Sequence, residues 1–286
     1  MQVHYSIDSL PAFRHAVLTI GTFDGVHLGH REIIRRLIEE ARRIGGESVI
    51  LTFHPHPRKV LRAGSQAVAL LNTIEEKTAL LDSLGIDHLV VIPFTEAFAQ
   101  MSASQYVEEF LLRYFQPHTI IIGYDHRFGK GRSGNYSLLE QYRDQGRFAL
   151  QEIPEQLLNS NTVSSTRIRE ALLNGHPMEA GRLLGYDYYF EGKVVKGNQL
   201  GRTLGYPTAN LEPLHPEKLI PSNGVYAVTC SIKKDLKVFA DSQGKMAWQG
   251  MMNIGIRPTV DGTGRVIEVN IFEFNEVIYG DILRVT

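Results

Sequence analysis

The hydrophobic pattern of the chain changes its period near residue 185, and this change limits the folds that the chain can adopt. Before that point, short apolar runs alternate with segments in which apolar residues recur at helical spacing. This pattern is typical of a layered α/β domain with a largely parallel sheet. After it, alternating or β-branched runs are separated by glycine, proline and asparagine, as in a small antiparallel barrel. Since 286 residues with 43% hydrophobic content can fill two cores, we predict two domains, at residues 1–185 and 186–286.

Several elements of the first domain can be placed from the sequence. The predicted strands cover residues 16–21, 48–53, 88–92 and 119–123, and the predicted helices cover residues 29–44, 74–84, 103–114 and 165–174. The second helix opens with Thr73 and Glu76, which have the spacing of a capping box. Pro177 can start a further helix at its first turn.

Composition narrows the function classes. The chain has 30 Lys and Arg against 31 Asp and Glu, so it has no basic excess for nucleic acid, and we expect no nucleic-acid partner. Its single cysteine, Cys230, lies in a strand-like stretch and is interpreted as a buried hydrophobe. The N-terminus has no leader pattern and no apolar run reaches a membrane span, so we expect a soluble, cytoplasmic protein. The sequence leaves the oligomeric state open.

The first candidate site is GTFDGVHLGH, residues 21–30, directly after the first predicted strand. In open α/β sheets, ligands bind outside the carboxyl ends of the strands. Gly21 and Gly25 allow a tight turn and a close approach to a ligand, and the helix that begins near Gly29 directs free N–H groups to the same place. His27 and His30 lie three residues apart and share one side of a helical turn. The arrangement suits a phosphate group.

A lone histidine here would more simply be a surface or capping residue, but the pair, the glycines and the strand end together favour a site. HxGH at this position resembles the signature of the nucleotidyltransferase superfamily, whose members attack the α-phosphate of a nucleoside triphosphate. A second stretch, VSSTRIR at residues 163–169, resembles the ISSTxxR motif of that superfamily. Ser165 and Thr166 can cap a helix, and Arg169 offers a fork of donors to phosphate oxygens.

The second candidate site lies in the predicted barrel, in GNQLGRTLGYPTANL at residues 197–211. Gly197, Gly201 and Gly205 are compatible with a phosphate-cradling loop, although the stretch is not a Walker A motif. In the strand-like PTAN, Thr208 and Asn210 face one side, where their oxygens can hold a hard cation such as Mg²⁺. Taken alone, the stretch is better explained as a glycine-rich hairpin with polar caps.

The chain as a whole resembles the bifunctional bacterial riboflavin kinase/FAD synthetase family. The first half matches at TIGTFDGVHLGH, LTFHPHPRKVL, GYDHRFGKGRSGN and VSSTRIREAL, and the second half at GRTLGYPTANL, PSNGVY, MNIGIRPT and IEVNIFEF. The resemblance implies a Rossmann-like nucleotidyltransferase domain and a barrel-shaped riboflavin kinase domain. The implied substrates are riboflavin, FMN and ATP, with Mg²⁺ as cofactor and FMN and FAD as intermediate and product.

The resemblance also implies roles for single residues. In the first domain, His27 and His30 would be catalytic, stabilising charge on the phosphates. The nucleotide would contact Gly21, Phe23, Gly29, Ser165, Thr166 and Arg169. The flavin would contact His54, Pro55, His56, Asp125, Arg132 and Asn135. From residues alone, the HPHP stretch fits a rigid extended segment as well.

In the second domain the resemblance makes Glu268 the catalytic base. Without it, a carboxylate between the apolar residues of VIEVNIF would be interpreted as part of a solvated strand face. Thr208 and Asn210 would hold the metal. The nucleotide would contact Gly197, Gly201, Thr203 and Gly205.

Two departures from the family pattern affect these expectations. The sequence stops at YGDILRVT, residues 279–286, where the kinase domain of the family usually continues into a helical segment. Kinase activity is therefore a less secure expectation than adenylyl transfer. In addition, His126 stands where many relatives carry an aromatic residue.

Three alternatives stay open on the sequence alone. The chain could make FAD only, with an impaired kinase domain, or it could be a flavin-binding module without turnover. It could also transfer a nucleotidyl group to another phosphate ester. Release of pyrophosphate that depends on FMN separates an enzyme from a binding module.

Overall fold

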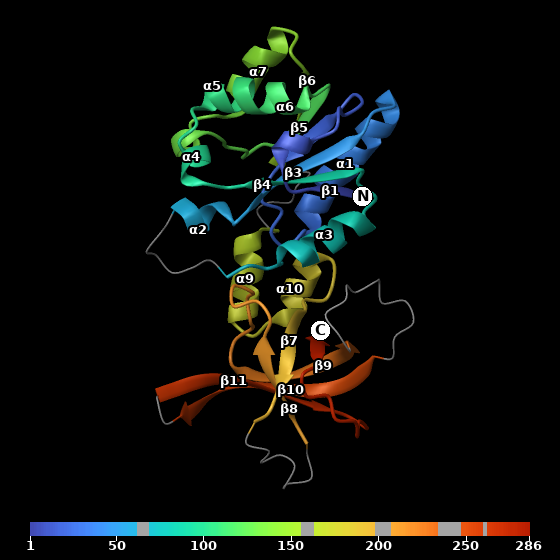
Figure 1. Cartoon of the computed structure of the whole chain (residues 1–286), viewed down its shortest axis with the longest axis vertical. Coiled ribbons are helices and arrows are strands. Elements are labelled where there is room, and N and C mark those ends of the chain that lie inside the picture. The colour runs from blue at the N-terminus through green and yellow to red at the C-terminus, as the bar shows by residue number, and fades with distance from the viewer. Residues whose placement is uncertain (62–68, 156–162, 198–206, 234–246, 260–261) are drawn as a thin grey trace. The chain divides into compact units, whose positions relative to one another are not determined.

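The chain folds into two compact units, Met1–Ser165 and Thr166–Thr286, in the computed structural model (Figure 1). The structure describes residues 1–61, 69–155, 163–197, 207–233, 247–259 and 262–286. The predicted fold class is confirmed, because the first unit contains a parallel sheet with helices and the second a closed antiparallel barrel.

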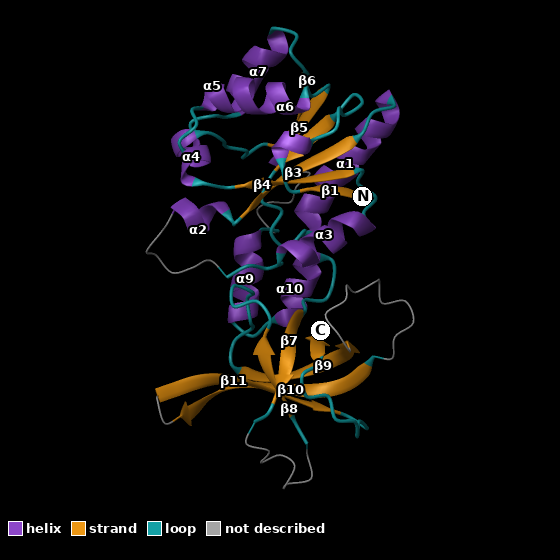
Figure 2. Ribbon diagram, in the orientation of Figure 1, coloured by secondary structure: helices purple, strands orange, loops and turns teal. Residues whose placement is uncertain are grey.

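A six-stranded parallel sheet forms the centre of the first unit (Figure 2). Its order is β1-β4-β3-β2-β5-β6. The strands are β1 (Gln2–His4), β2 (Val17–Ile20), β3 (Ser48–His54), β4 (His88–Pro93), β5 (Thr119–Gly123) and β6 (Ala149–Ile153). The four predicted strands are confirmed as β2 to β5. The sequence analysis missed β1 and β6, which lie at the two edges of the sheet, because an edge strand needs no continuous apolar run.

The predicted helices of this unit are confirmed as well. The structure contains α1 (Leu28–Ile44), α2 (Pro57–Leu61), α3 (Ile74–Ser83), α4 (Glu96–Ala99), α5 (Ala103–Gln105), the π-helix η2 (Tyr106–Leu112), α6 (Arg113–Phe115) and α7 (Tyr136–Asp144), with 3₁₀ turns η1 (Ile7–Ser9) and η3 (Lys130–Arg132). The capping box is present, since Thr73 and Glu76 each bond the backbone N–H of the other. The segment predicted at residues 103–114 is helical throughout but has a π-helical middle.

Both faces of the sheet are buried, and neighbouring residues of one strand serve opposite cores. In β2, Val17 packs in a cluster with Leu37 of α1 and Leu81 of α3, whereas Leu18 packs in a cluster with Phe110 of η2. This two-residue alternation is what a strand covered by helices on both faces requires. The strands therefore hold the loops at their carboxyl ends on a rigid base.

The second unit contains a closed barrel of order β10-β11-β8-β7-β12-β9. Its strands are β7 (Phe190–Val195), β8 (Ala209–Pro213), β9 (Gly224–Lys233), β10 (Trp248–Thr259), β11 (Gly262–Ile271) and β12 (Ile282–Val285). Cys230 is fully buried in its core, as expected, and burial raises the pKa of its thiol to about 12. The barrel core is therefore apolar around this thiol.

Two helices, α9 (Ser165–Leu173) and α10 (Pro177–Leu184), connect the sheet to the barrel in sequence. Packing groups them with the barrel, since the backbone carbonyl of Leu172 accepts a hydrogen bond from the N–H of Ser222 at 3.0 Å. The domain boundary predicted after residue 185 is based on the change in the hydrophobic pattern of the sequence, and it stays a prediction.

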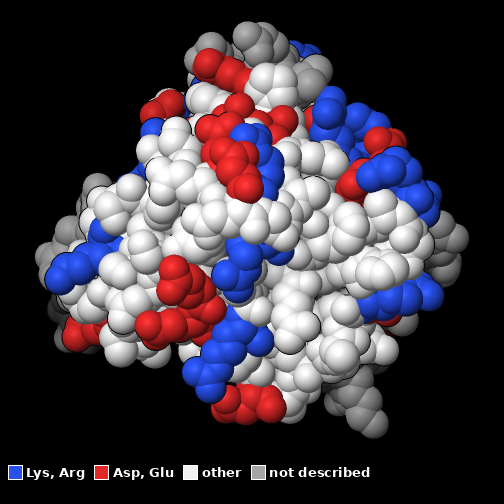
Figure 3. All heavy atoms as spheres, turned by 90° about the horizontal axis from the view of Figure 1, so that it is seen from above, with Lys and Arg blue, Asp and Glu red and all other residues white. Residues whose placement is uncertain are grey.

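Acidic and basic side chains are interspersed on the face shown in Figure 3. On that face the described residues show small mixed groups of the two signs, in line with the balanced composition.

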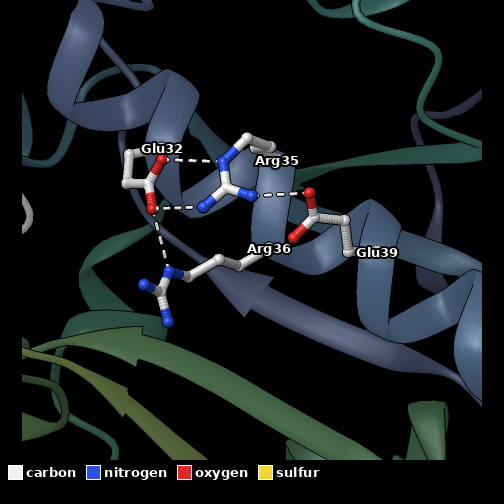
Figure 4. A network of polar contacts seen from close by, with 4 residues as sticks. All are labelled: Glu32, Arg35, Arg36 and Glu39. Atoms are coloured by element: carbon white, nitrogen blue, oxygen red, sulfur yellow. Dashed lines mark hydrogen bonds and ion pairs between the residues drawn. The ribbon is translucent and has the colours of Figure 1, made fainter.

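The exposed side of α1 carries a network of ion pairs (Figure 4). Arg35 donates to both oxygens of Glu32, at 2.9 and 2.7 Å, and also bonds Glu39. Arg36 donates to Glu32 at 2.9 Å. These bonds, those from Arg35 first, lower the pKa of Glu32 to about 2.

We expect the stabilising effect of Glu32 to depend on pH. Because the pKa of the folded state lies below the ordinary 4.5, the contribution is complete above pH 4.5 and is lost as the pH falls toward 2. The difference in urea midpoint between the wild type and Glu32→Gln should therefore shrink across this range. It should be small throughout and smaller in high salt, since the network is exposed. A difference that grows on acidification would contradict the assignment.

Candidate active sites

The first candidate site lies where the strand order of the sheet reverses. From β2 the chain continues through β3 and β4 on one side, and β5 and β6 lie on the other. Such a switch point leaves a crevice at the carboxyl ends of the two central strands, where α/β proteins bind their ligands. The stretch at residues 21–30 follows β2 directly and therefore lies at this crevice.

The turn between β2 and α1 has an unusual backbone. Phe23, Gly25 and Val26 have φ angles of 45°, 91° and 38°, in the left-handed region that bulky residues avoid. The side chains of Phe23 and Val26 are 2% and 0% exposed and pack in the core. Gly21 has an ordinary φ, but a Cβ there would lie 3.1 Å from the Phe23 ring. Tertiary packing thus stabilises a strained turn, in which the Phe23 side chain is part of the core.

His27 and His30 stack on one another at the start of α1, with ring centroids 3.6 Å apart and planes inclined by 15°. His27 is the N-cap residue, and its Nδ1 accepts the backbone N–H of His30 at 3.3 Å. That nitrogen therefore carries no proton, and the proton of the neutral ring is on Nε2.

The His30 ring is neutral at physiological pH. Burial lowers its pKa well below the usual 6.5, and the nearby His27 and Lys77 lower it further. Its Nδ1 is buried and has no hydrogen-bond partner among the residues that the structure describes. His30 thus presents a neutral ring beside His27 at the N-terminus of α1.

Behind the turn lies a charged pair that the sequence analysis missed. Lys77 of α3 and Asp24 of the turn are only 6% and 2% exposed. The Lys77 ammonium donates to the Thr22 carbonyl at 2.7 Å and to the Thr52 hydroxyl at 3.3 Å. A signal exists in the sequence, because Lys77 shares the buried face of α3 with Leu81, at helical spacing.

A small pocket joins this pair to the end of β3. It is lined by Asp24, Phe53, His54, His56, Leu70, Asn72, Ile74 and Lys77. Two of the predicted flavin contacts, His54 and His56, therefore lie in one pocket with the buried pair. Pro55 lies between them in the chain.

The loop after β5 contains the other predicted flavin contacts. Asp125 is exposed, and Arg132 has a φ of 60° at the end of η3. The side chain of Asn135 caps α7 by accepting the N–H of Leu138 at 3.1 Å, which gives it a structural task. His126 stacks near Phe128, and burial lowers the pKa of His126 to about 4. The ring that departs from the family pattern is therefore neutral.

Ser165 connects the second motif to the first. Its hydroxyl donates to the backbone carbonyl of Asp24 at 2.9 Å, although 141 positions separate the two residues. Thr166 and Arg169 follow along α9, where Thr166 is exposed and Arg169 is half-buried. The start of α9 is thus tied to the turn that carries the histidines.

The second candidate site lies on the outer face of the barrel. In β11, Ile267 and Val269 point into the core, so Glu268 faces outward. Its register places it opposite Asn210 of β8 and opposite Asn253 of β10. Directly paired residues have Cβ atoms about 4.5–5.5 Å apart, so the predicted base and metal ligand are neighbours. Asn253 is an additional polar residue that the sequence analysis did not single out.

The surroundings of Asn210 are tightly built. A Cβ at Gly197 would collide with the Asn210 amide, so a larger residue there would displace this side chain. The amide of Asn270 donates to the Pro207 carbonyl at 2.7 Å and so fixes the backbone just before Thr208. The predicted contacts Gly201, Thr203 and Gly205 lie outside the described residues.

The sequence profile of the FAD synthetase family matches residues 10–167, and that of the riboflavin kinase family matches residues 184–286. Together these matches cover most of the chain. The chain belongs to the bifunctional riboflavin kinase/FMN adenylyltransferase family. It is a transferase of flavin biosynthesis, with a kinase and an adenylyltransferase activity.

Relatives with this description cover nearly the whole chain. The enzyme of Haemophilus influenzae is 36% identical over 94% of this chain and 83% of its own length. That of Listeria monocytogenes is 36% identical over 93% and 80%, and that of Escherichia coli is 34% identical over 94% and 82%. In each of these relatives, the match therefore includes both halves of this chain.

A crystal structure of a Streptococcus pneumoniae protein, described as a macrolide-efflux protein, has the same fold. It superposes with a TM-score of 0.83 at 30% identity and covers 99% of this chain and 88% of that one. The description of that protein concerns efflux, whereas both profile matches of this chain are to flavin enzymes. In the described part of the chain, every helix is too short or too polar for a membrane span.

Proposed function

We propose that the two candidate sites carry the two activities, FMN adenylylation at the switch point of the sheet and riboflavin phosphorylation on the outer face of the barrel. The observation that carries this assignment is the pairing of Glu268 with Asn210 in the second unit, beside the stacked histidines in the first. Each arrangement combines the residue types that its reaction needs.

In the second unit, Glu268 accepts the proton of the riboflavin 5′-hydroxyl. The freed oxygen attacks the γ-phosphorus of ATP, the bond to the β-phosphate oxygen breaks, and FMN and ADP are the products. Such a transfer needs mainly positioning, charge neutralisation and a base.

Mg²⁺ fits the oxygen donors at this place. Thr208 and Asn210 offer a hydroxyl and an amide oxygen, which are hard ligands, and Mg²⁺ commonly takes its remaining ligands from water and nucleotide phosphates. Among the described residues, no group of three or more His, Cys, Asp or Glu is arranged to hold a metal. When bound, the ion would neutralise charge on the β- and γ-phosphates.

In the first unit, the FMN phosphate attacks the α-phosphorus of a second ATP, and pyrophosphate leaves with the broken P–O bond. The nucleophile is already a phosphate oxygen, so no protein nucleophile is needed. The N–H groups of His27 and His30, with the free backbone N–H groups of α1, stabilise charge on the phosphates. Ser165 contacts the remaining phosphates, and the pocket with His54 and His56 contributes to the flavin side. The family resemblance gives Thr166 and Arg169 the same phosphate-binding role as Ser165.

Because both reactions consume ATP, we place the enzyme in the cytoplasm. In a time course with riboflavin, ATP and Mg²⁺, we expect FMN to appear first and then to give way to FAD. Chromatography of riboflavin, FMN and FAD measures this order, beside a second reaction started from FMN. If only the FMN-fed reaction makes FAD, the barrel site is inactive in this chain. Without Mg²⁺ both products should be lost, and undiminished turnover in a chelator would contradict the metal.

A further inference from the structure

Lys77 is a buried cation close to the adenylyl-transfer site, and the reaction as described does not use it. It is 6% exposed, and an ammonium that leaves water is costly unless it is paired and hydrogen-bonded. It donates to the Thr22 carbonyl and to the Thr52 hydroxyl, and that hydroxyl in turn donates to the same carbonyl at 3.2 Å. Two donors from α3 and β3 thus hold one peptide group of the turn.

Asp24 is the counter-charge of Lys77 and ties the turn to other elements. Its Oδ1 accepts the backbone N–H groups of Leu71 and Asn72, at 3.0 and 3.2 Å, just before α3. Its backbone carbonyl accepts the hydroxyl of Ser165. The buried pair therefore joins the end of β2, the start of α3 and the start of α9.

The turn that these bonds hold is the strained one. Thr22 and Asp24 flank Phe23, whose φ is positive, and Gly25 and Val26 continue in the left-handed region. Strained backbone persists only where its surroundings determine it. The same turn sets the position of the N-cap His27 and of His30, whose pKa is sensitive to the charge of Lys77.

We propose that Lys77 is a positioning residue for adenylyl transfer, which holds the Thr22 carbonyl and balances Asp24 so that the histidine pair and the helix N-terminus meet the phosphates. The inference rests on the proposed role of this site. It adds a residue that contacts the loop rather than the substrate.

The charge of Lys77 should matter in a defined pH range. Burial lowers its pKa from 10.5 to about 8, with Asp24 opposing the shift, and His30, His54 and His56 are the other titratable groups near the same pocket. As the pH rises through about 8, the ammonium becomes neutral, and the Asp24 carboxylate is left unbalanced beside a polyphosphate site. Adenylylation should therefore decline there.

The test compares Lys77→Met, Lys77→Arg and the exposed control Arg42→Met in the full chain. For Lys77→Met we expect kcat of FMN adenylylation to fall about tenfold to a hundredfold, as for a displaced loop, while riboflavin phosphorylation by the same sample stays unchanged. Arginine stays charged at all accessible pH values. Lys77→Arg should therefore retain part of the activity and lose the decline above pH 8.

Two outcomes would overturn the proposal. One is a Lys77→Met variant with wild-type kcat, and the other is a Lys77→Arg variant whose alkaline decline is the same as in the wild type. The second comparison stays informative if Lys77→Met does not fold. His30→Ala, measured in parallel, distinguishes failure of the proposed active site from failure of the role of Lys77. If His30→Ala is fully active, the proposed active site is wrong. If His30→Ala is inactive and the Lys77 variants are normal, only the role of Lys77 is refuted.

Discussion

Glu268→Ala should abolish FMN formation from riboflavin while FAD formation from supplied FMN continues at the wild-type rate. The carboxylate is the base for the hydroxyl proton, and loss of such a group typically costs about 10²–10⁴-fold in rate. The fold should tolerate the change, because Glu268 lies on the outer face and its neighbours Ile267 and Val269 keep the core. Steady-state rates of both half-reactions in one preparation measure the separation.

Two further variants sharpen this result. Glu268→Gln keeps the size and much of the hydrogen bonding but is no base, so it should be as inactive as the alanine variant. Glu276→Ala removes an exposed carboxylate of the same unit and should behave as the wild type. Near-normal kinase turnover in Glu268→Gln would exclude the role as base.

His30→Ala should have the complementary effect, with FAD formation lowered about 10²–10³-fold and FMN formation unchanged. This is the range for removing one preorganised donor that stabilises developing charge. His30 is the cleaner of the two histidines for this test, because its side chain caps no helix. Pyrophosphate release from ATP in the presence of FMN measures the loss.

His27 needs a different substitution because it is also the N-cap of α1. Asparagine is a good N-cap residue, so His27→Asn keeps the start of the helix and removes only the imidazole. It should lose FAD formation to a similar degree without a large change in thermal stability. The exposed His118→Ala serves as control. If His27→Asn makes FAD normally, the capping role of His27 is its whole role.

Much of the fold could be predicted from the sequence because its signals are local. The central strands β2 to β5 are continuous apolar runs, and the capping box of Thr73 and Glu76 is a matter of spacing along four residues. The edge strands β1 and β6 gave no such signal, since their polar residues face solvent. The helix at residues 103–114 was predicted, but the π-helical form of its middle part η2 was not, because it shares its hydrophobic pattern with an ordinary helix.

The residues of the candidate sites also fall into two groups, those that the sequence identifies and those that only the structure identifies. The histidine motif, the glycines and Glu268 stand out in the sequence through their residue types and spacing, and resemblance to a known family gives them roles. Asn253 gives no such signal, and the helical spacing of Lys77 with Leu81 indicates only a buried position, because the importance of both residues comes from their partners in space. Lys77 lies 53 positions after Asp24 in the numbering, and Asn253 faces Glu268 only through the register of two strands.

The sequence by itself determined which residue types are available, where helices begin and which strand faces are apolar, since these follow from contacts between near neighbours. Only the tertiary structure decided that His30 is neutral, that Lys77 and Asp24 interact in the buried interior, and that Glu268 lies beside Asn210. The physical reason is that desolvation and electrostatic interaction depend on distance and burial in space, which no local pattern of residues fixes.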